Sequence, residues 1–264
     1  MIISLKNDKV VQATYFIFTR REELYEMAEM LDVFRKEKKY IISQTTSSNL
    51  YQLFSQVLHE DANNSSNLGY MVRSLYFDTI DDTDYTEKED GLEYRKKIRL
   101  RIYSPNQSSA KLELKEKSGD NQRKRSMTVS KEHALELIAG RYECLLSYDN
   151  PFAQELYFIM VQQLYLPKCI VEYKRRAFIV PENDIRLTLD ARIEASESNF
   201  DLFATNLNLY PVSNFDDVTL EVKYNRFLLS YIRDLLSGCN KMSTSNSKYC
   251  LGRSVSRSSG GFFT

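Results

Sequence analysis

The amino-acid sequence predicts an α+β protein built on a largely antiparallel β-sheet, either flat or closed into a barrel. Three observations lead to this fold class. Eight segments alternate apolar and polar residues with the two-residue period of strands, and four other segments carry helical patterning. No internal repeat or glycine-rich linker divides the 264 residues. We therefore expect one main domain in which helices flank the sheet.

The expected elements follow one another in a definite order along the chain. They are, in turn, a helix over 20–32, a strand over 37–42, a helix over 47–60, strands over 70–77, 95–103, 110–117 and 123–129, a helix over 150–166, strands over 168–180, 185–192 and 218–224, and a helix over 226–237. The segments 104–109 and 118–121 are rich in turn-forming residues, so each is expected to close a hairpin.

The helices are indicated by composition, apolar spacing and signals at their ends. Residues 20–32 are good helix formers, and the segment 47–60 places its apolar residues on one face. Asn150 followed by Pro151 is typical of an N-cap with proline at the first helical position. Gly238 follows the apolar pairs of the last helix, as a C-terminal glycine does.

The charged residues of the strands gather on one face of each strand. Side chains two residues apart on a strand point the same way, so Lys97, Arg99 and Arg101 share a face. Three further strands share this design, with Lys111, Glu113, Lys115 and Lys117, then Arg186, Thr188 and Asp190, then Glu221 and Lys223. A solvated surface would explain each strand singly. Turned inward, such faces would suit a polyanion and a divalent metal.

Charge is segregated along the chain although its total is zero. The chain has 36 Lys plus Arg and 36 Asp plus Glu. Residues 78–93 contain eight acidic residues against one basic, whereas residues 94–125 contain eleven basic against three acidic. Residues 223–257 contain seven basic residues against Asp234 alone. The positive charge is therefore concentrated in a few segments.

Other features exclude several classes of protein. The four cysteines form no CxxC pair and there are only two histidines, which excludes a structural zinc site of the usual kind. No apolar run reaches the roughly 18 residues that a membrane span needs, and no signal peptide is expected. We expect a cytoplasmic protein with reduced thiols. Residues 1–32 are expected to form a helical extension, and the Ser/Gly-rich residues 253–264 a flexible tail.

Nine short motifs, in order over residues 33–252, carry a resemblance to a known family. They are 35–40 (RKEKKY), 72–79 (VRSLYFDT), 85–91 (YTEKEDG), 97–103 (KIRLRIY), 112–117 (LELKEK), 173–178 (YKRRAF), 185–190 (IRLTLD), 220–223 (LEVK) and 247–252 (SKYCLG). The chain resembles the VTC domain, the polyphosphate polymerase branch of the triphosphate tunnel metalloenzymes related to the CYTH proteins. That resemblance implies an eight-stranded, closed antiparallel β-barrel with flanking helices and a basic tunnel over residues 33–252.

The resemblance also implies which residues form the site. Catalytic cations are expected at Arg99, Arg101, Lys115, Arg175 and Arg186. Phosphate-binding residues are expected at Lys39, Lys88, Lys124, Ser247 and Lys248, to which we add Lys97 and Lys223 from the charged faces. Glu221 matches the glutamate that binds Mn²⁺ or Mg²⁺, and Glu37 and Glu113 are either further metal ligands or salt-bridge partners.

Three positions stay open at this point. Either Arg175 or Arg176 faces the tunnel, because neighbouring strand residues point to opposite faces unless a bulge intervenes. Arg123 or Arg125 could take the place of Lys124. Lys88 stands where eukaryotic relatives have arginine, and Ser245 where they have a lysine that Lys241 could replace.

The function implied by the resemblance is transfer of the γ-phosphate of ATP to a growing inorganic polyphosphate chain. Two alternatives use the same residues. Attack by water would give a tripolyphosphatase or nucleoside triphosphatase, and loss of catalysis would leave a polyanion-binding module. No nucleic acid is expected as a ligand, because the aromatic residues do not alternate with basic ones on an exposed face. Eukaryotic relatives work within membrane complexes, and whether this chain needs a membrane-protein partner stays open.

Overall fold

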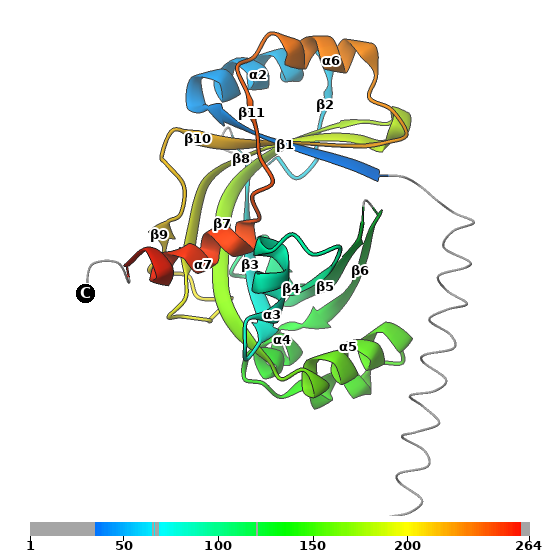
Figure 1. Cartoon of the computed structure of the whole chain (residues 1–264), viewed down its shortest axis with the longest axis vertical. Helices are drawn as coiled ribbons and strands as arrows, with labels where there is room; N and C mark the ends of the chain where they lie inside the picture. The colour runs from blue at the N-terminus through cyan, green and yellow to red at the C-terminus, as the bar shows by residue number, and fades with distance from the viewer. Residues whose placement is uncertain (1–34, 65, 67–68, 120, 260–264) are drawn as a thin grey trace, which may run out of the picture. The chain divides into compact units, whose positions relative to one another are not determined.

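The computed structural model describes residues 35–64, 66, 69–119 and 121–259, so the helix expected over 20–32 lies outside them. Within the unit Arg35–Thr264, the described residues form one 11-stranded antiparallel sheet with helices on its faces (Figure 1). The fold class is α+β. No helix in this part of the chain is long and apolar enough to cross a bilayer.

The elements have the following bounds. The strands are β1 (Arg35–Ser43), β2 (His59–Glu60), β3 (Tyr70–Thr79), β4 (Tyr94–Ile102), β5 (Ser109–Ser118), β6 (Asn121–Ser130), β7 (Tyr165–Val180), β8 (Ile185–Ser196), β9 (Tyr210–Pro211), β10 (Asp217–Asn225) and β11 (Met242–Ser243). The helices are α2 (Gln44–Val57), α3 (Thr83–Glu89), α4 (Lys131–Ile138), α5 (Pro151–Gln162), α6 (Ser230–Ser237) and α7 (Lys248–Ser259), with 3-10 helices η1 (Tyr142–Ser147) and η2 (Glu182–Asp184).

The sheet is open. Its strands follow the order β11-β1-β10-β8-β7-β3-β4-β5-β6, with β2 paired to β7 and β9 to β8. All eight predicted strands are present, as β1, β3 to β8 and β10, but β11 and β6 do not pair, so the expected closed eight-stranded barrel is wrong. The outer edge of β1 is already occupied, because Tyr40 and Ile41 pair with β11. Side chains span the gap instead, at Glu37 and Lys115.

The sheet curves, so that β1, β10 and β8 lie opposite β4, β5 and β6 (Figure 1). Helix α7 packs inside this curve against β7. A β-carbon on Gly252 would lie 2.6 Å from Val171 Cγ2, so only glycine permits this close approach. A bulge in β8 places Arg192 at φ 53°, and it lets Ile193 join the buried cluster around Tyr249 of α7.

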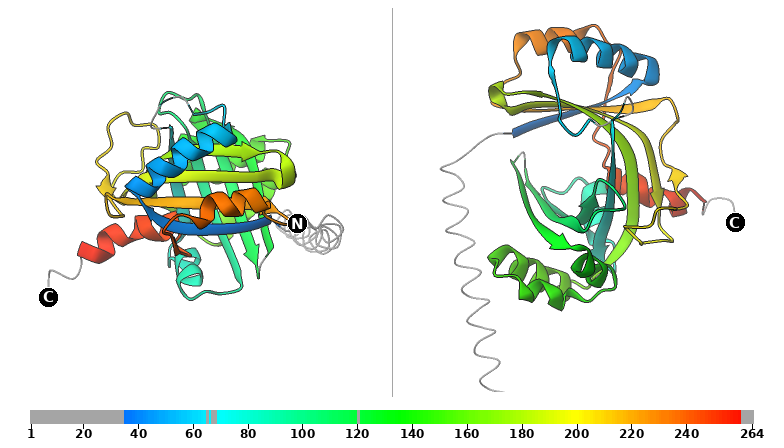
Figure 2. Two further views of the ribbon diagram at one scale, coloured as in Figure 1. Left: turned by 90° about the horizontal axis from the view of Figure 1, so that it is seen from above. Right: turned by 180° about the vertical axis from the view of Figure 1, so that it is seen from behind.

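Three apolar clusters hold the sheet and helices together. One joins the outer face of β1, β10 and β8 to α2 and α6, which lie across these strands in Figure 2. A second joins the outer face of β4, β5 and β6 to α4, η1 and α5, and the third joins β3 and β7 to α7. Each fully buried Leu, Ile or Phe contributes roughly 1.5–3 kcal/mol. In the first two clusters the apolar strand faces point outward to helices, which leaves the charged faces of these strands on the concave side.

Helix starts and ends differ modestly from those expected. The Asn150 side chain accepts from the Phe152 N–H and Pro151 is the first residue of α5, as predicted. Helix α6 begins at Ser230 rather than 226, and Gly238 is its C-cap. Helix α7 runs to Ser259, through part of the segment expected to be a flexible tail.

Helix α3 lies in an acidic segment for which no element is expected. The capping residue of its first turn lies outside the helix, in β3: the Asp78 carboxylate accepts hydrogen bonds from the backbone N–H groups of Asp84 and Tyr85. A cap supplied by β3 leaves no local signal in the residues of α3 itself.

Candidate functional site

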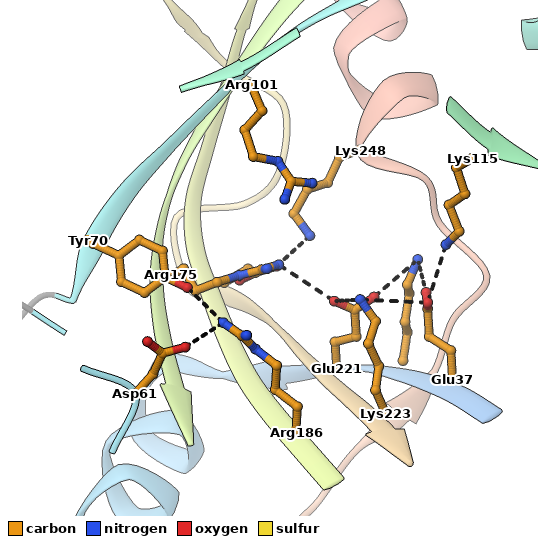
Figure 3. A network of polar contacts seen from close by, with 12 residues as sticks. Glu37, Asp61, Tyr70, Arg101, Lys115, Arg175, Arg186, Glu221, Lys223 and Lys248 are labelled. Atoms are coloured by element: carbon orange, nitrogen blue, oxygen red, sulfur yellow. Dashed lines mark hydrogen bonds and ion pairs between the residues drawn. The ribbon is translucent and has the colours of Figure 1, made fainter. Parts of the chain in front are cut away.

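The basic residues of several strands meet on the concave side of the sheet. We name as the cationic face Lys39 of β1, Lys97, Arg99 and Arg101 of β4, Lys115 of β5, Lys124 of β6, Arg175 of β7, Arg186 of β8, Lys223 of β10 and Lys248 of α7. Ion pairs connect several of these strands. Figure 3 shows how the side chains of six members converge, those of Arg101, Lys115, Arg175, Arg186, Lys223 and Lys248. The period-2 alternation places them together, since the apolar residues between them face the outer helices.

Two glutamates from neighbouring strands lie among the lysines at one side of the face. The Lys39 Nζ lies 3.0 Å from Glu37 Oε1 and 3.8 Å from Glu221 Oε1. The Lys223 Nζ lies 3.2 Å from Glu221 Oε2 and 3.8 Å from Glu37 Oε2, and Lys115 reaches Glu37 at 3.3 Å. Burial favours the neutral acid, but Lys223, Lys39 and the nearby cations hold the pKa of Glu221 well below its usual value.

Asp190 forms the most enclosed ion cluster of the site, and sequence reasoning did not single it out. Its side chain is fully buried, and it accepts two hydrogen bonds from the Arg175 guanidinium, at 2.6 and 2.7 Å. The Lys248 Nζ lies 2.6 Å away, and Tyr173 stacks beneath both cations. Asp190 shares a strand face with Arg186, so the alternation of residues along β8 was the sequence signal that could have placed Asp190 in the site.

Arg175 rather than Arg176 faces the concave side. The Arg175 Nη2 lies 3.5 Å from Glu221 Oε2, whereas the Arg176 guanidinium lies 4.1 Å from the Tyr51 ring centroid of α2, on the outer face. Although the bulge lies nearby, it inserts its extra residue into β8, so the alternation of β7 is kept.

Glu113 binds three cations at the opposite side of the face. Its carboxylate lies 2.7 Å from Arg99 Nε, 3.0 Å from Arg101 Nη2 and 2.6 Å from Lys124 Nζ. This arrangement is that of a salt-bridge partner, the second of the two roles expected for Glu113. Of the three basic residues considered on β6, Lys124 is therefore the concave one. Arg125 instead pairs with Glu116 and with Glu155 of α5 on the outer side.

Arg186, Lys88 and Lys97 complete the placement of the expected cations. The Arg186 Nη2 donates to Asp61 at 2.7 Å and to the Tyr70 hydroxyl at 3.1 Å. The Lys97 Nζ lies 2.6 Å from Ser247 Oγ. Burial, together with repulsion from Lys39, Lys88 of α3 and Lys115, lowers the pKa of Lys97 to about 8. Lys241 instead donates to the Leu236 carbonyl.

Among the buried donors without a hydrogen-bond partner in the described residues, two lie on the strand faces that carry members of the cationic face. They are Arg101 Nε and Thr188 Oγ1. Both residues are nearly fully buried, and they belong to strands whose charged faces form the site. Unsatisfied buried donors are costly, so they favour a ligand that supplies acceptor oxygens.

The residues present fit a divalent cation held jointly with a phosphate ligand. In the part of the chain that the structure describes, no group of three or more His, Cys, Asp or Glu side chains could hold a metal ion alone. Glu37 and Glu221 nevertheless converge on the same two ammonium groups. Mg²⁺ commonly takes one or two carboxylates and completes its shell with phosphate oxygens and water.

The fold and the site together define an α+β protein whose curved antiparallel sheet presents a cationic, carboxylate-containing concave face. The model of the VTC domain family matches residues 34–257. The chain therefore belongs to the VTC domain family.

Several solved structures are similar to this chain. The protein bh2851 of Bacillus halodurans, which carries the name putative adenylate cyclase, is 14% identical to this chain. The match covers 81% of this chain and 96% of that chain, with a TM-score of 0.47. PH1819 of Pyrococcus horikoshii is 9% identical, with coverages of 82% and 97% and a TM-score of 0.41. A chain of the Schizosaccharomyces pombe Mediator head module is 8% identical, with coverages of 80% and 99% and a TM-score of 0.46. Comparison with curated proteins found no significant match.

Proposed function

We propose that this chain is a metal-dependent phosphotransferase that moves the γ-phosphate of ATP onto a growing inorganic polyphosphate chain. The observation that carries the proposal is the excess of cations over carboxylates on one concave face of the sheet. Among the described residues, the ten cations of this face are matched by five ion-paired carboxylates, those of Glu37, Asp61, Glu113, Asp190 and Glu221. A triphosphate would supply the missing negative charge and the acceptors for Arg101 Nε and Thr188 Oγ1.

Phosphoryl transfer depends mainly on positioning and on neutralising charge, and this site offers both. Arg99, Arg175 and Lys115 would hold the triphosphate, with the two arginines already oriented by Glu113 and Asp190. Glu221, assisted by Glu37, would hold Mn²⁺ or Mg²⁺, which when bound would neutralise charge on the phosphate oxygens. A terminal oxygen of the acceptor phosphate would attack the γ-phosphorus, the bond to the β-phosphate oxygen would break, and ADP would leave.

The proposal is tested with the purified full chain, ATP, Mn²⁺ and a diphosphate primer. We expect acid-precipitable chains whose internal phosphates appear in ³¹P spectra, with one ADP released per phosphate added. Release of orthophosphate without chain growth would indicate that the chain is a hydrolase that uses the same site, and would contradict the polymerase proposal. Tight binding of tripolyphosphate without any ADP release would instead indicate a binding module.

Glu221→Gln separates binding from turnover in the same assay. The change removes a carboxylate beside Lys39 and Lys223, so metal-free affinity for tripolyphosphate should be kept or increased. Turnover should fall by about 100-fold or more, because a metal ligand is lost. The exposed Glu143→Gln is the matched control and should behave like the unmodified chain. Full turnover in Glu221→Gln would contradict the metal assignment.

A further inference from the structure

Lys97 differs from the other members of the cationic face in its partner. Each of the others lies within 4.0 Å of a carboxylate of the described residues. Lys97 has no such carboxylate among them, and its Nζ lies 2.6 Å from the hydroxyl oxygen of Ser247. The two residues are 150 positions apart in sequence, so the fold rather than local chain geometry brings them together.

This amine can accept a proton at ordinary pH. Burial, with repulsion from Lys39 of β1, Lys88 of α3 and Lys115 of β5, lowers the pKa of Lys97 to about 8, while Cys250 of α7 acts in the opposite direction. Roughly one Lys97 side chain in ten is therefore neutral at pH 7. A hydroxyl at hydrogen-bond distance from a neutral amine has the geometry of an activated nucleophile beside its base.

Ser247 lies where a phosphate chain would be held. Its carbonyl accepts from the Leu251 N–H, so it caps α7, and the next residue, Lys248, belongs to the cationic face. The Ser247 side chain is partly exposed, which leaves room for an incoming phosphoryl group. The positive end of the 12-residue α7 and the ammonium of Lys248 would both favour the negative charge that a phosphoryl group brings.

We propose that Ser247 is the first phosphoryl acceptor, so that chain synthesis starts covalently on this serine with Lys97 as its base. This inference rests on the proposed function. Ser247 Oγ attacks the γ-phosphorus of ATP and forms the new O–P bond. The bond between the γ-phosphorus and its bridging oxygen breaks, ADP leaves with that electron pair, and the hydroxyl proton passes to Lys97 Nζ. The phosphoserine then presents a terminal oxygen to the next ATP.

The first experiment looks for the covalent product. The full chain is incubated with Mn²⁺ and γ-³²P-labelled ATP without any primer, and is then denatured in acid and digested. We expect acid-stable label on the peptide containing Ser247, assigned to that residue by mass spectrometry. The label should be absent from Ser247→Ala and present in Ser245→Ala, a matched change at an exposed position outside the cationic face.

The second experiment separates initiation from phosphate binding. Without primer, Ser247→Ala should make chains at least 10-fold more slowly than the unmodified protein, because its first acceptor is missing. With diphosphate as primer, the loss in Ser247→Ala should be at least 10-fold smaller than without primer, because the first acceptor is then supplied and only a phosphate contact of the hydroxyl is missing. If the Ser247 hydroxyl only contacted substrate, Ser247→Ala would lose activity equally with and without primer. That result would overturn the proposal.

The third experiment tests Lys97 as the base. Lys97→Arg keeps the positive charge but cannot give up a proton in the accessible range. The rate of Ser247 labelling should rise with pH through about 8 or above in the unmodified chain, and Lys97→Arg should lower it about 100-fold and flatten that profile. Normal polyphosphate synthesis with no label on Ser247 would overturn this inference while leaving the polymerase proposal intact. If no ADP were released at all, both the inference about Ser247 and the polymerase proposal would be contradicted.

Discussion

At the scale of single residues, Asp190 shows how a buried carboxylate prepares cations for an anionic ligand. It lies between Arg175 and Lys248, and although burial opposes ionisation, those two cations lower the pKa of Asp190. Its charge thereby compensates the cost of keeping an arginine and a lysine away from water. The same carboxylate fixes the direction in which the Arg175 guanidinium points, because it accepts two of its hydrogen bonds.

Asp190→Asn should therefore destabilise the free protein by about 3–5 kcal/mol, because it removes the carboxylate that pairs with Lys248 and lies nearest to Arg175. The free energy of unfolding, measured by urea titration, checks this value. Added tripolyphosphate should restore part of the loss, since an anionic ligand can pair with Arg175 and Lys248. The exposed Asp81→Asn serves as the control and should change little. Equal stability of Asp190→Asn and the unmodified chain would show that Asp190 does not balance these cations.

At the scale of elements, two buried aspartates fix helices to the sheet: Asp78 of β3 binds α3 and α7, and Asp84 of α3 binds β7. Asp78 accepts from the Tyr249 hydroxyl of α7 at 2.5 Å and caps α3, while Asp84 accepts from the Tyr165 hydroxyl at 2.8 Å. Burial first, and then the nearby Asp78, raises the pKa of Asp84 to about 7, although Lys96 acts against the shift. A buried carboxyl in this position favours its neutral form.

The pH dependence of stability follows from that shift. A folded-state pKa above the unfolded value gives a stabilising contribution that is present below about pH 4 and is lost as pH rises through about 7. Asp84→Asn cannot ionise, so its stability relative to the unmodified chain should increase by about 3 kcal/mol between pH 5 and pH 8. Denaturant unfolding at both pH values checks this. Parallel pH curves for the two proteins would contradict the raised pKa.

The local elements could largely be predicted from sequence, because alternation and capping residues are local signals. All eight expected strands form, and Asn150 with Pro151 marks the start of α5 as expected. Helix α3 could not be predicted, since its cap comes from Asp78 on another element. Asp190 was recognised as part of a charged strand face, but its two cationic partners lie on β7 and α7, and only the tertiary fold brings them to it.

At the scale of the whole described unit, sheet closure was the feature that sequence did not determine. Alternation fits both a flat and a closed sheet, and the closed barrel came from the resemblance alone. The structure has an open sheet whose β1 edge pairs with β11, with ion pairs rather than backbone hydrogen bonds across the gap. The neutral total charge is consistent with this arrangement, because cations gather on the concave face while acidic residues such as those of 78–93 lie in another segment.

The most direct test of the central claim is a crystal structure of the full chain with a non-hydrolysable ATP analogue and Mn²⁺. The account predicts triphosphate density on the concave face, in contact with Arg99, Arg175 and Lys115, and an anomalous manganese signal at Glu221. It also predicts that Lys39 and Lys223 turn at least partly from Glu37 and Glu221 toward the phosphates. Triphosphate bound on an outer face, with the ion pairs of the cationic face unchanged, would contradict the account.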